Sequence, residues 1–301
     1  MSNELELIKR AETRNNTIAI RSKASEHTYA NLVDRSASIA SSILGGEGDL
    51  GESRIAFLAT EGYDYVSIQW GIWRAGGVTV PLCLSAAEPE LEYTLSNSGT
   101  SQVVTTRELS PKLEVLCERL DLRLSIFEEM NSETANELPD ISVNRRAMIL
   151  YTSGTTSKPK GVVTTHANIQ SQIETLVDAW EWQPSDRIPL FLPLHHIHGI
   201  INVLSCALWS GATIEAFPGF KTEAILDRVA ASAYTVFMAV PTIYVKLIQK
   251  LEALSRDDRA PIIRGFADMR LMVSGSAALP ASVHEQWTAL TGQKLLERYG
   301  M

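Results

Sequence analysis

The residues best suited to chemistry lie together in one stretch, residues 151–161, which reads Tyr-Thr-Ser-Gly-Thr-Thr-Ser-Lys-Pro-Lys-Gly. The stretch follows directly on the apolar run 147–151, which indicates a buried strand that opens into a loop. Glycine lets backbone N–H groups approach an anion closely, hydroxyl groups add short neutral donors, and lysines add positive charge. We therefore predict a cradle for a polyanion such as the phosphates of a nucleotide. Its members are Thr152, Ser153, Gly154, Thr155, Thr156, Lys158 and Lys160.

An ordinary surface loop is the alternative interpretation of this stretch. Clusters of Ser, Thr, Gly and Pro between periodic segments are common in such loops. The stretch also differs from the common P-loop, because no Gly-Lys-Ser or Gly-Lys-Thr ends it and Pro159 separates its two lysines. A helix that began at Ser157 would not tolerate this proline beyond its first turn. Composition alone leaves both interpretations open.

The segments that would position the loop alternate between strand and helix patterns. Short apolar runs predict strands at 54–59, 78–80, 102–106, 147–151, 187–192, 213–217, 235–240 and 270–273. Apolar residues at helical spacing predict helices at 28–45, 63–74, 169–180, 200–209, 222–231, 241–254 and 280–290, and another after Pro89. The segment 130–139 is polar and acidic, as in a linker. This alternation is typical of an α/β fold with layers of helices around mostly parallel sheets.

Composition and charge limit the possible functions. The chain has 301 residues, enough for one large α/β unit or two domains, and a formal net charge of −8. That charge disfavours nucleic acid or an anionic membrane as a general partner. No apolar run is long enough to span a bilayer, and the first residues lack a signal-peptide pattern. The cysteines have neither metal-type spacing nor an even disulfide set, so we expect a cytoplasmic protein.

The stretch 151–161 resembles the phosphate-binding motif of the adenylate-forming superfamily, the AMP-dependent synthetases and ligases. It departs from that motif at Ser157, where the family has glycine and where a left-handed backbone would be strained. Further segments resemble other motifs of the superfamily, in the family's order. They are 73–82, 192–199, 274–280 and 295–301. The resemblance therefore covers nearly the whole chain. Within the superfamily, the chain resembles the acyl-CoA synthetase branch.

The resemblance implies an enzyme that uses ATP, Mg²⁺ and CoA. In this superfamily a carboxylate attacks the α-phosphorus of ATP and releases pyrophosphate, and a thiol, usually that of CoA, then displaces AMP. The carboxylate is already a nucleophile, so catalysis needs alignment and neutralisation of phosphate charge. The implied catalytic residues are Lys158, Thr156 and His196. The implied nucleotide-binding residues are the cradle together with Ser274, Gly275, Ser276, Ala277, Tyr299 and Gly300. Those implied for the acid are His196, Arg298, Ser274 and Met301.

Three histidines, His195, His196 and His198, allow a metal site as one interpretation. Metal sites normally recruit further ligands, and no Cys, Asp or Glu cluster lies near them in the sequence. The resemblance instead places His196 beside the acyl carboxylate and gives the other two histidines packing or supporting roles. We therefore expect no metal site within this chain.

Arg298 is the residue that we expect to select the acid. The segments 192–199 and 295–301 are similar to those of malonyl-CoA synthetases. A guanidinium can bind the second carboxylate of a dicarboxylate bidentately, whereas an apolar pocket would exclude that charge. The alternative is a structural ion pair of Arg298 with Glu285 or near Glu297. The competing functions are a medium-chain or aryl acid–CoA ligase and a non-catalytic nucleotide-binding remnant.

The sequence ends at Met301, inside a motif that continues into Thr-Glu in the family. That glutamate helps to bind Mg²⁺, and the ribose-binding aspartate and a small domain with a catalytic lysine would follow it. The resemblance thus implies that residues 1–301 are an incomplete N-terminal AMP-binding domain without its C-terminal lid domain. We expect subregions of about 1–140 and 141–301, and little ATP–pyrophosphate exchange from this chain alone.

Overall fold

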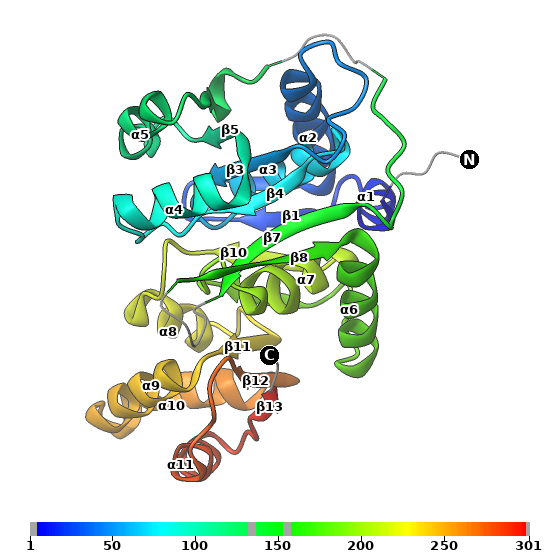
Figure 1. Ribbon diagram of the computed structural model, residues 1–301. Coiled ribbons are helices and arrows are strands. Elements are labelled where there is room, and N and C mark those ends of the chain that lie inside the picture. Colours follow the sequence, from blue (N-terminus) through cyan, green and yellow to red (C-terminus); the bar gives the residue numbers. More distant parts are fainter. Residues whose placement is uncertain (1–4, 132–136, 153–157, 299–301) are drawn as a thin grey trace.

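The computed structural model describes residues 5–131, 137–152 and 158–298. They form a layered fold in which sheets alternate with helices (Figure 1). The strands are β1 (Ile18–Arg21), β2 (Glu26–Thr28), β3 (Arg54–Leu58), β4 (Val78–Pro81), β5 (Thr100–Thr105), β6 (Arg123–Ile126), β7 (Arg146–Thr152), β8 (Lys160–Thr165), β9 (Arg187–Leu190), β10 (Thr213–Ala216), β11 (Val236–Ala239), β12 (Leu271–Gly275) and β13 (Leu296–Arg298).

The helices between these strands complete the α/β pattern that the sequence predicts. The α-helices are α1 (Glu6–Glu12), α2 (Tyr29–Leu44), α3 (Tyr63–Arg74), α4 (Glu88–Ser98), α5 (Glu114–Arg119), α6 (His166–Ala179), α7 (Cys206–Ser210), α8 (Thr222–Ala230), α9 (Pro241–Ala253), α10 (Arg256–Ala267) and α11 (Ala281–Thr291). Shorter helical segments are η1 (Ser110–Lys112), η2 (Phe127–Glu129) and the π-helix η3 (His198–Ser205).

A six-stranded sheet has the order β6-β5-β3-β4-β7-β8. Its strands are parallel except for β8, which pairs with β7 as an antiparallel hairpin. Side chains of β3 alternate between two cores. Ile55 and Phe57 pack in the core that contains α2 and α3, whereas Ala56 and Leu58 pack in the core that contains α4 and α5. Burial of both faces explains the continuous apolar run of β3, which is typical of a parallel sheet between helices.

The helices α2 and α3 confirm two sequence predictions. Thr28 and Asn31 form a capping box at the start of α2, and Gly45 ends the helix with a φ of +57°. The helix α3 packs closely against α2 at Gly71. A Cβ at position 71 would lie 2.5 Å from the Ile39 side chain, so the contact requires glycine.

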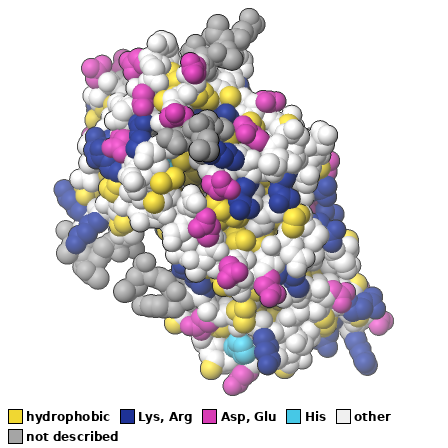
Figure 2. Space-filling view, turned by 90° about the vertical axis from the view of Figure 1, so that its right-hand side faces the viewer, with side chains coloured by type: hydrophobic (Ala, Val, Ile, Leu, Met, Phe, Trp, Pro, Cys, Tyr) yellow, Lys and Arg dark blue, Asp and Glu magenta, His cyan; other side chains and the backbone are white. Residues whose placement is uncertain are grey.

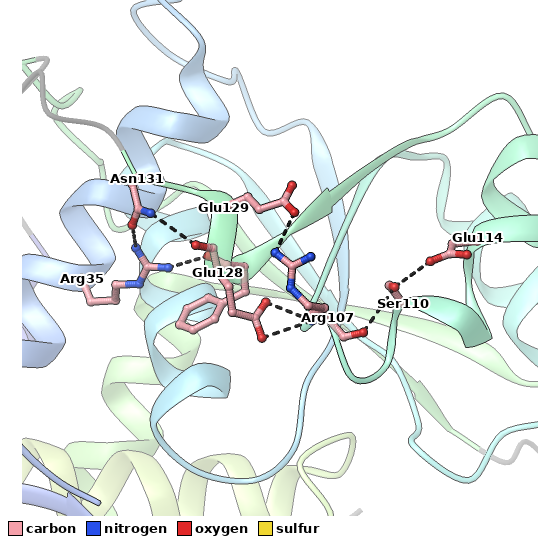
Figure 3. A network of polar contacts seen from close by, with 8 residues as sticks. Arg35, Arg107, Ser110, Glu114, Glu128, Glu129 and Asn131 are labelled. Carbon is pink, nitrogen blue, oxygen red and sulfur yellow. Dashed lines mark hydrogen bonds and ion pairs between the residues drawn. The ribbon is translucent and has the colours of Figure 1, made fainter.

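The edge of the six-stranded sheet is fixed by a network around Arg35 (Figure 3). The Arg35 guanidinium donates to the carbonyl oxygens of Phe127 (2.5 Å) and Met130 (2.9 Å), and lies over the Phe127 ring. The backbone N–H of Arg107 donates to the Glu128 carboxylate at 2.9 Å. These contacts attach η2, which follows the edge strand β6, to α2 and to the end of β5.

Two smaller sheets have the orders β2-β1-β10-β9 and β11-β12-β13. The buried carboxylate of Asp186, just before β9, joins them. It accepts hydrogen bonds from Thr235, just before β11 (2.7 Å), and from Nε of Arg270, just before β12 (2.8 Å); a second Arg270 contact makes the pair bidentate. Burial alone would raise the pKa of Asp186, but these hydrogen bonds outweigh it and hold the pKa below its ordinary value.

Strand pairing crosses the subregion boundary that we expect near residue 140. The strand β7 pairs with β4, and β1 pairs with β10, so two of the three sheets draw on both stretches of the chain, whereas β11, β12 and β13 all come from the second stretch. The division of the chain at this position stays a prediction.

Some elements lack the sequence pattern that would reveal them. The helix α10 begins with a highly charged turn and contains Pro261, so no helix is predicted there. The helix predicted at 200–209 begins earlier, as the π-helix η3, and continues as α7. The strand β8 contains the exposed residues Val162 and Val163 and was not predicted either.

The surface is mixed in charge on the face that Figure 2 shows, where Lys and Arg side chains are interspersed with Asp and Glu. None of the helices formed by the described residues is both long enough and apolar enough to cross a membrane.

We predict that Asp186→Asn lowers the free energy of unfolding by about 3 kcal/mol, because it leaves the partly buried Arg270 charge without its partner. Urea unfolding followed by circular dichroism measures the change. The matched control is Glu223→Gln, which breaks the exposed ion pair with Lys250 (3.2 Å) and should leave stability unchanged. Equal stabilities of the Asp186→Asn variant and the unaltered chain would contradict the role of Asp186.

Candidate functional site

The hairpin of β7 and β8 holds the two ends of the predicted phosphate loop side by side. In its register Thr152 lies opposite Lys160, and Tyr151 lies opposite Gly161. Thr152, Lys158 and Lys160 are exposed and can reach a ligand. The other predicted members of the cradle lie outside the described residues, so their roles stay predictions. They are Ser153, Gly154, Thr155 and Thr156.

The side chain of Tyr151, at the first end of the loop, contacts α4. Its hydroxyl donates to Oδ1 of Asn97 at 2.8 Å. The opposite residue, Gly161, leaves room for its ring: a Cβ there would lie 3.3 Å from Cζ of Tyr151 and 3.0 Å from Cγ2 of Ile149. A side chain at position 161 would therefore press on Tyr151 or on β7, which gives this motif glycine a packing reason.

A second group of predicted residues lies at the carboxyl ends of β12 and β13. These strands are parallel, and Gly275 lies opposite Arg298 in their register. Ser274 is fully buried, and its hydroxyl has no hydrogen-bond partner among the described residues. Ser276 and Ala277 are exposed beyond the strand, and Ser276 has a φ of +68°, a left-handed conformation that is uncommon for serine. Uncommon backbone conformations of this kind gather at functional sites.

His198 contacts this second group. Its Nδ1 lies 2.9 Å from Oγ of Ser276, and a Cβ at Gly275 would lie 2.9 Å from its Cε1. The ring is only 5% exposed, and its Nε2 has no partner among the described residues. Burial, together with the positive charge of Arg298, lowers the pKa of His198 to about 4. His198 is therefore neutral at pH 7 and has one buried ring nitrogen that no described residue uses.

The other two histidines lie nearer the surface. His196 is exposed and His195 is half-buried, and their ring centroids are 4.0 Å apart. Burial lowers the pKa of His196, and burial together with His196 lowers the pKa of His195 to about 4. The substrate role of His196 stays a prediction. No pattern in the sequence indicates that His198, two residues further on, is the histidine in contact with Ser276.

Arg298 is half-buried at the end of β13. Within the described part of the chain it forms no ion pair with Glu285 or Glu297, so the structural alternative for this guanidinium has no contact in its favour. Its positive charge is near enough to His198 and Cys206 to affect the pKa of both. Tyr299, Gly300 and Met301 lie outside the described residues, and their predicted roles are untested.

Among the described residues, no group of three or more His, Cys, Asp or Glu side chains is arranged to hold a metal ion. The polar groups that the hairpin and the second cluster present are hydroxyls, amino groups, a neutral imidazole and a guanidinium. This set suits phosphate and carboxylate ligands.

Residues 7–301 match the model of the family described as AMP-binding enzyme. The chain belongs to this family. It is 40% identical to the mitochondrial malonate–CoA ligase ACSF3 of Mus musculus, over 94% of this chain and 52% of that protein. It is 34% identical to the malonate–CoA ligase of Arabidopsis thaliana, over 94% of this chain and 53% of that protein. The chain thus spans about half the length of the curated relatives it matches.

Solved structures agree with the α/β fold. The crystal structure of ATP-bound MatB from Rhodopseudomonas palustris matches all of this chain and 60% of that one, with a TM-score of 0.85 and 30% identity. The structure of a malonyl-CoA ligase in complex with methylmalonyl-CoA and AMP also matches. The match covers 99% of this chain and 61% of the ligase chain, with a TM-score of 0.82 and 29% identity. Both comparisons confirm the fold class expected from the sequence.

We predict that protonation of His198 destabilises the fold as the pH falls. Its pKa of about 4 in the folded chain lies below the ordinary value of 6.5. The unfolded chain therefore binds the proton more readily, and the stability from the neutral ring is lost as the pH falls from 6.5 toward 4. Between pH 7 and pH 4.5 the free energy of unfolding that is lost in this way is about 2 kcal/mol.

The His198→Gln variant, whose side chain stays neutral, should show a shallower fall of unfolding free energy over this range. Urea unfolding at both pH values measures the difference between variant and unaltered chain. If the two curves fall in parallel, His198 is not the buried neutral base described above.

Proposed function

We propose that this chain supplies the ATP-binding and acid-binding part of a carboxylate–CoA ligase that acts on malonate or a related dicarboxylate. The observation that carries the proposal is the half-buried Arg298, without an ion-pair partner among the described residues and next to the neutral His198. Malonate–CoA ligases among the relatives, and the ATP-bound MatB structure, support the same substrate and nucleotide.

The proposed reaction has two steps. A carboxylate oxygen of the acid attacks the α-phosphorus of ATP, which forms the acyl-adenylate and releases pyrophosphate. The thiolate of CoA then attacks the acyl carbon, which forms the thioester and releases AMP. The loop hydroxyls and Lys158 bind the β- and γ-phosphate oxygens and neutralise the charge that grows on the leaving pyrophosphate. Lys160, beyond Pro159, adds positive charge at the second end of the loop.

The acid is held by its second carboxylate in this proposal. The Arg298 guanidinium binds that carboxylate with two hydrogen bonds, while the reacting carboxylate is left free to face the α-phosphorus. His198 remains neutral beside Arg298, so it adds a hydrogen bond without adding charge. A neutral neighbour also avoids repulsion of the guanidinium.

We consider Mg²⁺ only as an ion that accompanies the bound nucleotide. Among the described residues no group of three or more His, Cys, Asp or Glu side chains is arranged to hold a metal ion, so we assign Mg²⁺ no protein ligands and derive no step through it. When bound, Mg²⁺ supplies further neutralisation of phosphate charge, as it commonly does with one or two protein ligands.

Two narrower expectations stay proposals. A medium-chain or aryl acid remains the alternative substrate, since a feruloyl-CoA synthase of Amycolatopsis is 27% identical over 98% of this chain. The expected cytoplasmic location is also a proposal, and the mouse and human relatives carry the word mitochondrial in their names.

We predict that Arg298→Ala weakens malonate binding by about tenfold or more in the presence of ATP, because a charge-assisted bidentate contact is lost. Butyrate, which has no second carboxylate, should bind the variant and the unaltered chain alike. Isothermal titration with both acids measures the two affinities. Arg298→Lys should be intermediate, since an ammonium cannot reproduce the fork of the guanidinium.

The matched control is Arg256→Ala, which removes an exposed arginine from the start of α10. It should leave both acids unaffected. Equal losses for malonate and butyrate in Arg298→Ala, or no binding of malonate by the unaltered chain, would count against the proposed substrate.

A further inference from the structure

Tyr93 on α4 contacts both ends of the phosphate loop. Its hydroxyl donates to the carbonyl oxygen of Pro159 at 2.9 Å. Its ring lies edge-on to the ring of Tyr151, with the centroids 6.1 Å apart. The ammonium group of Lys158 lies over its face, 5.5 Å from the ring centroid. Tyr93, which is remote in sequence, thus contacts Tyr151 at the first end of the loop. It also contacts Lys158 and Pro159 at the second end.

The helix that carries Tyr93 is firmly anchored. Leu91 and Leu95 are each 1% exposed and belong to the core on this side of the six-stranded sheet. Tyr93 and Asn97 are one helical turn apart, so they share a face of α4. Asn97 accepts from the Tyr151 hydroxyl at one end of the loop, and Tyr93 donates to Pro159 at the other.

These contacts exceed what packing requires. A packing role would need the contact with the Tyr151 ring alone. The hydroxyl of Tyr93 instead fixes a loop carbonyl, and its ring face holds a cation within the distance of about 6 Å at which such pairs attract. Both additional contacts involve the end of the loop that carries the two lysines.

We propose that Tyr93 is a positioning residue for the triphosphate. It fixes the backbone at Pro159 and keeps the Lys158 ammonium at the mouth of the loop before the nucleotide binds. A side chain that is already restricted loses less conformational freedom on binding, so the affinity for the ligand rises. The inference rests on the proposed function, in which Lys158 binds the β- and γ-phosphates. AMP lacks these phosphates, so Tyr93 should affect ATP binding and not AMP binding.

Two variants separate the contacts of Tyr93. Tyr93→Phe removes the hydrogen bond to Pro159 and keeps the ring beneath Lys158. Tyr93→Leu removes both and keeps an apolar side chain. The matched control is Tyr63→Phe, which removes a hydroxyl that donates to the carbonyl oxygen of Asn31 at 3.1 Å, on a different helix. Urea unfolding of each variant shows whether it is folded before its binding is compared.

We expect Tyr93→Phe to weaken ATP binding by about fivefold, the effect of one hydrogen bond, and Tyr93→Leu to weaken it further. AMP binding should stay unchanged in both, and Tyr63→Phe should bind both nucleotides like the unaltered chain. Isothermal titration gives these affinities. Unchanged ATP affinity in both Tyr93 variants, or an equal loss for ATP and AMP, would overturn the positioning role.

Hydrogen exchange of the nucleotide-free chain keeps this inference distinct from the proposed function. The amides of residues 158 and 160–162 should exchange faster in Tyr93→Phe than in Tyr63→Phe, because the second end of the loop is released; Pro159 has no amide hydrogen. Equal exchange rates would overturn the anchoring whether or not ATP binds. Faster exchange in a chain that binds no ATP would instead support the anchoring and contradict the proposed function.

Discussion

Parallel strand pairing is the constraint on which both parts of the site depend. Parallel neighbours end at the same edge of a sheet, so the segments that follow them meet there. The pairing of β4 with β7 brings α4, which follows β4, to the loop that follows β7. The pairing of β12 with β13 brings Gly275 opposite Arg298. Each half of the site is thus assembled by backbone hydrogen bonds, and its side chains only complete it.

In the group of residues at the ends of β12 and β13, Arg298 carries positive charge and His198 is neutral. Burial keeps His198 neutral, and the neighbouring guanidinium of Arg298 strengthens that preference. The same guanidinium forms no ion pair within the described part of the chain, in contrast to Arg270, whose charge Asp186 neutralises. The two arginines therefore differ in kind. Arg270 ties strands together at the start of a sheet, whereas Arg298, at the end of one, is the arginine that we propose to bind an anion.

Much of the fold follows from local patterns in the sequence. The cap at Thr28, the glycine stop at Gly45 and the strand runs all have local causes, and the structure confirms them. The helix α10 was missed because its apolar face is short and a proline interrupts it. The contact of His198 with Ser276 and that of Tyr93 with Pro159 depend on segments that only the folded chain brings together. No pattern near either residue announces such a partner, so sequence spacing could identify the motifs but not these supporting side chains.

A crystal structure of this chain with a non-hydrolysable ATP analogue and malonate would show both ligands directly. We expect the triphosphate between Thr152 and Lys160, with the Lys158 ammonium on its outer phosphates, and the free carboxylate of malonate on the Arg298 guanidinium. A nucleotide bound elsewhere, with the loop of the β7–β8 hairpin empty, would contradict this expectation.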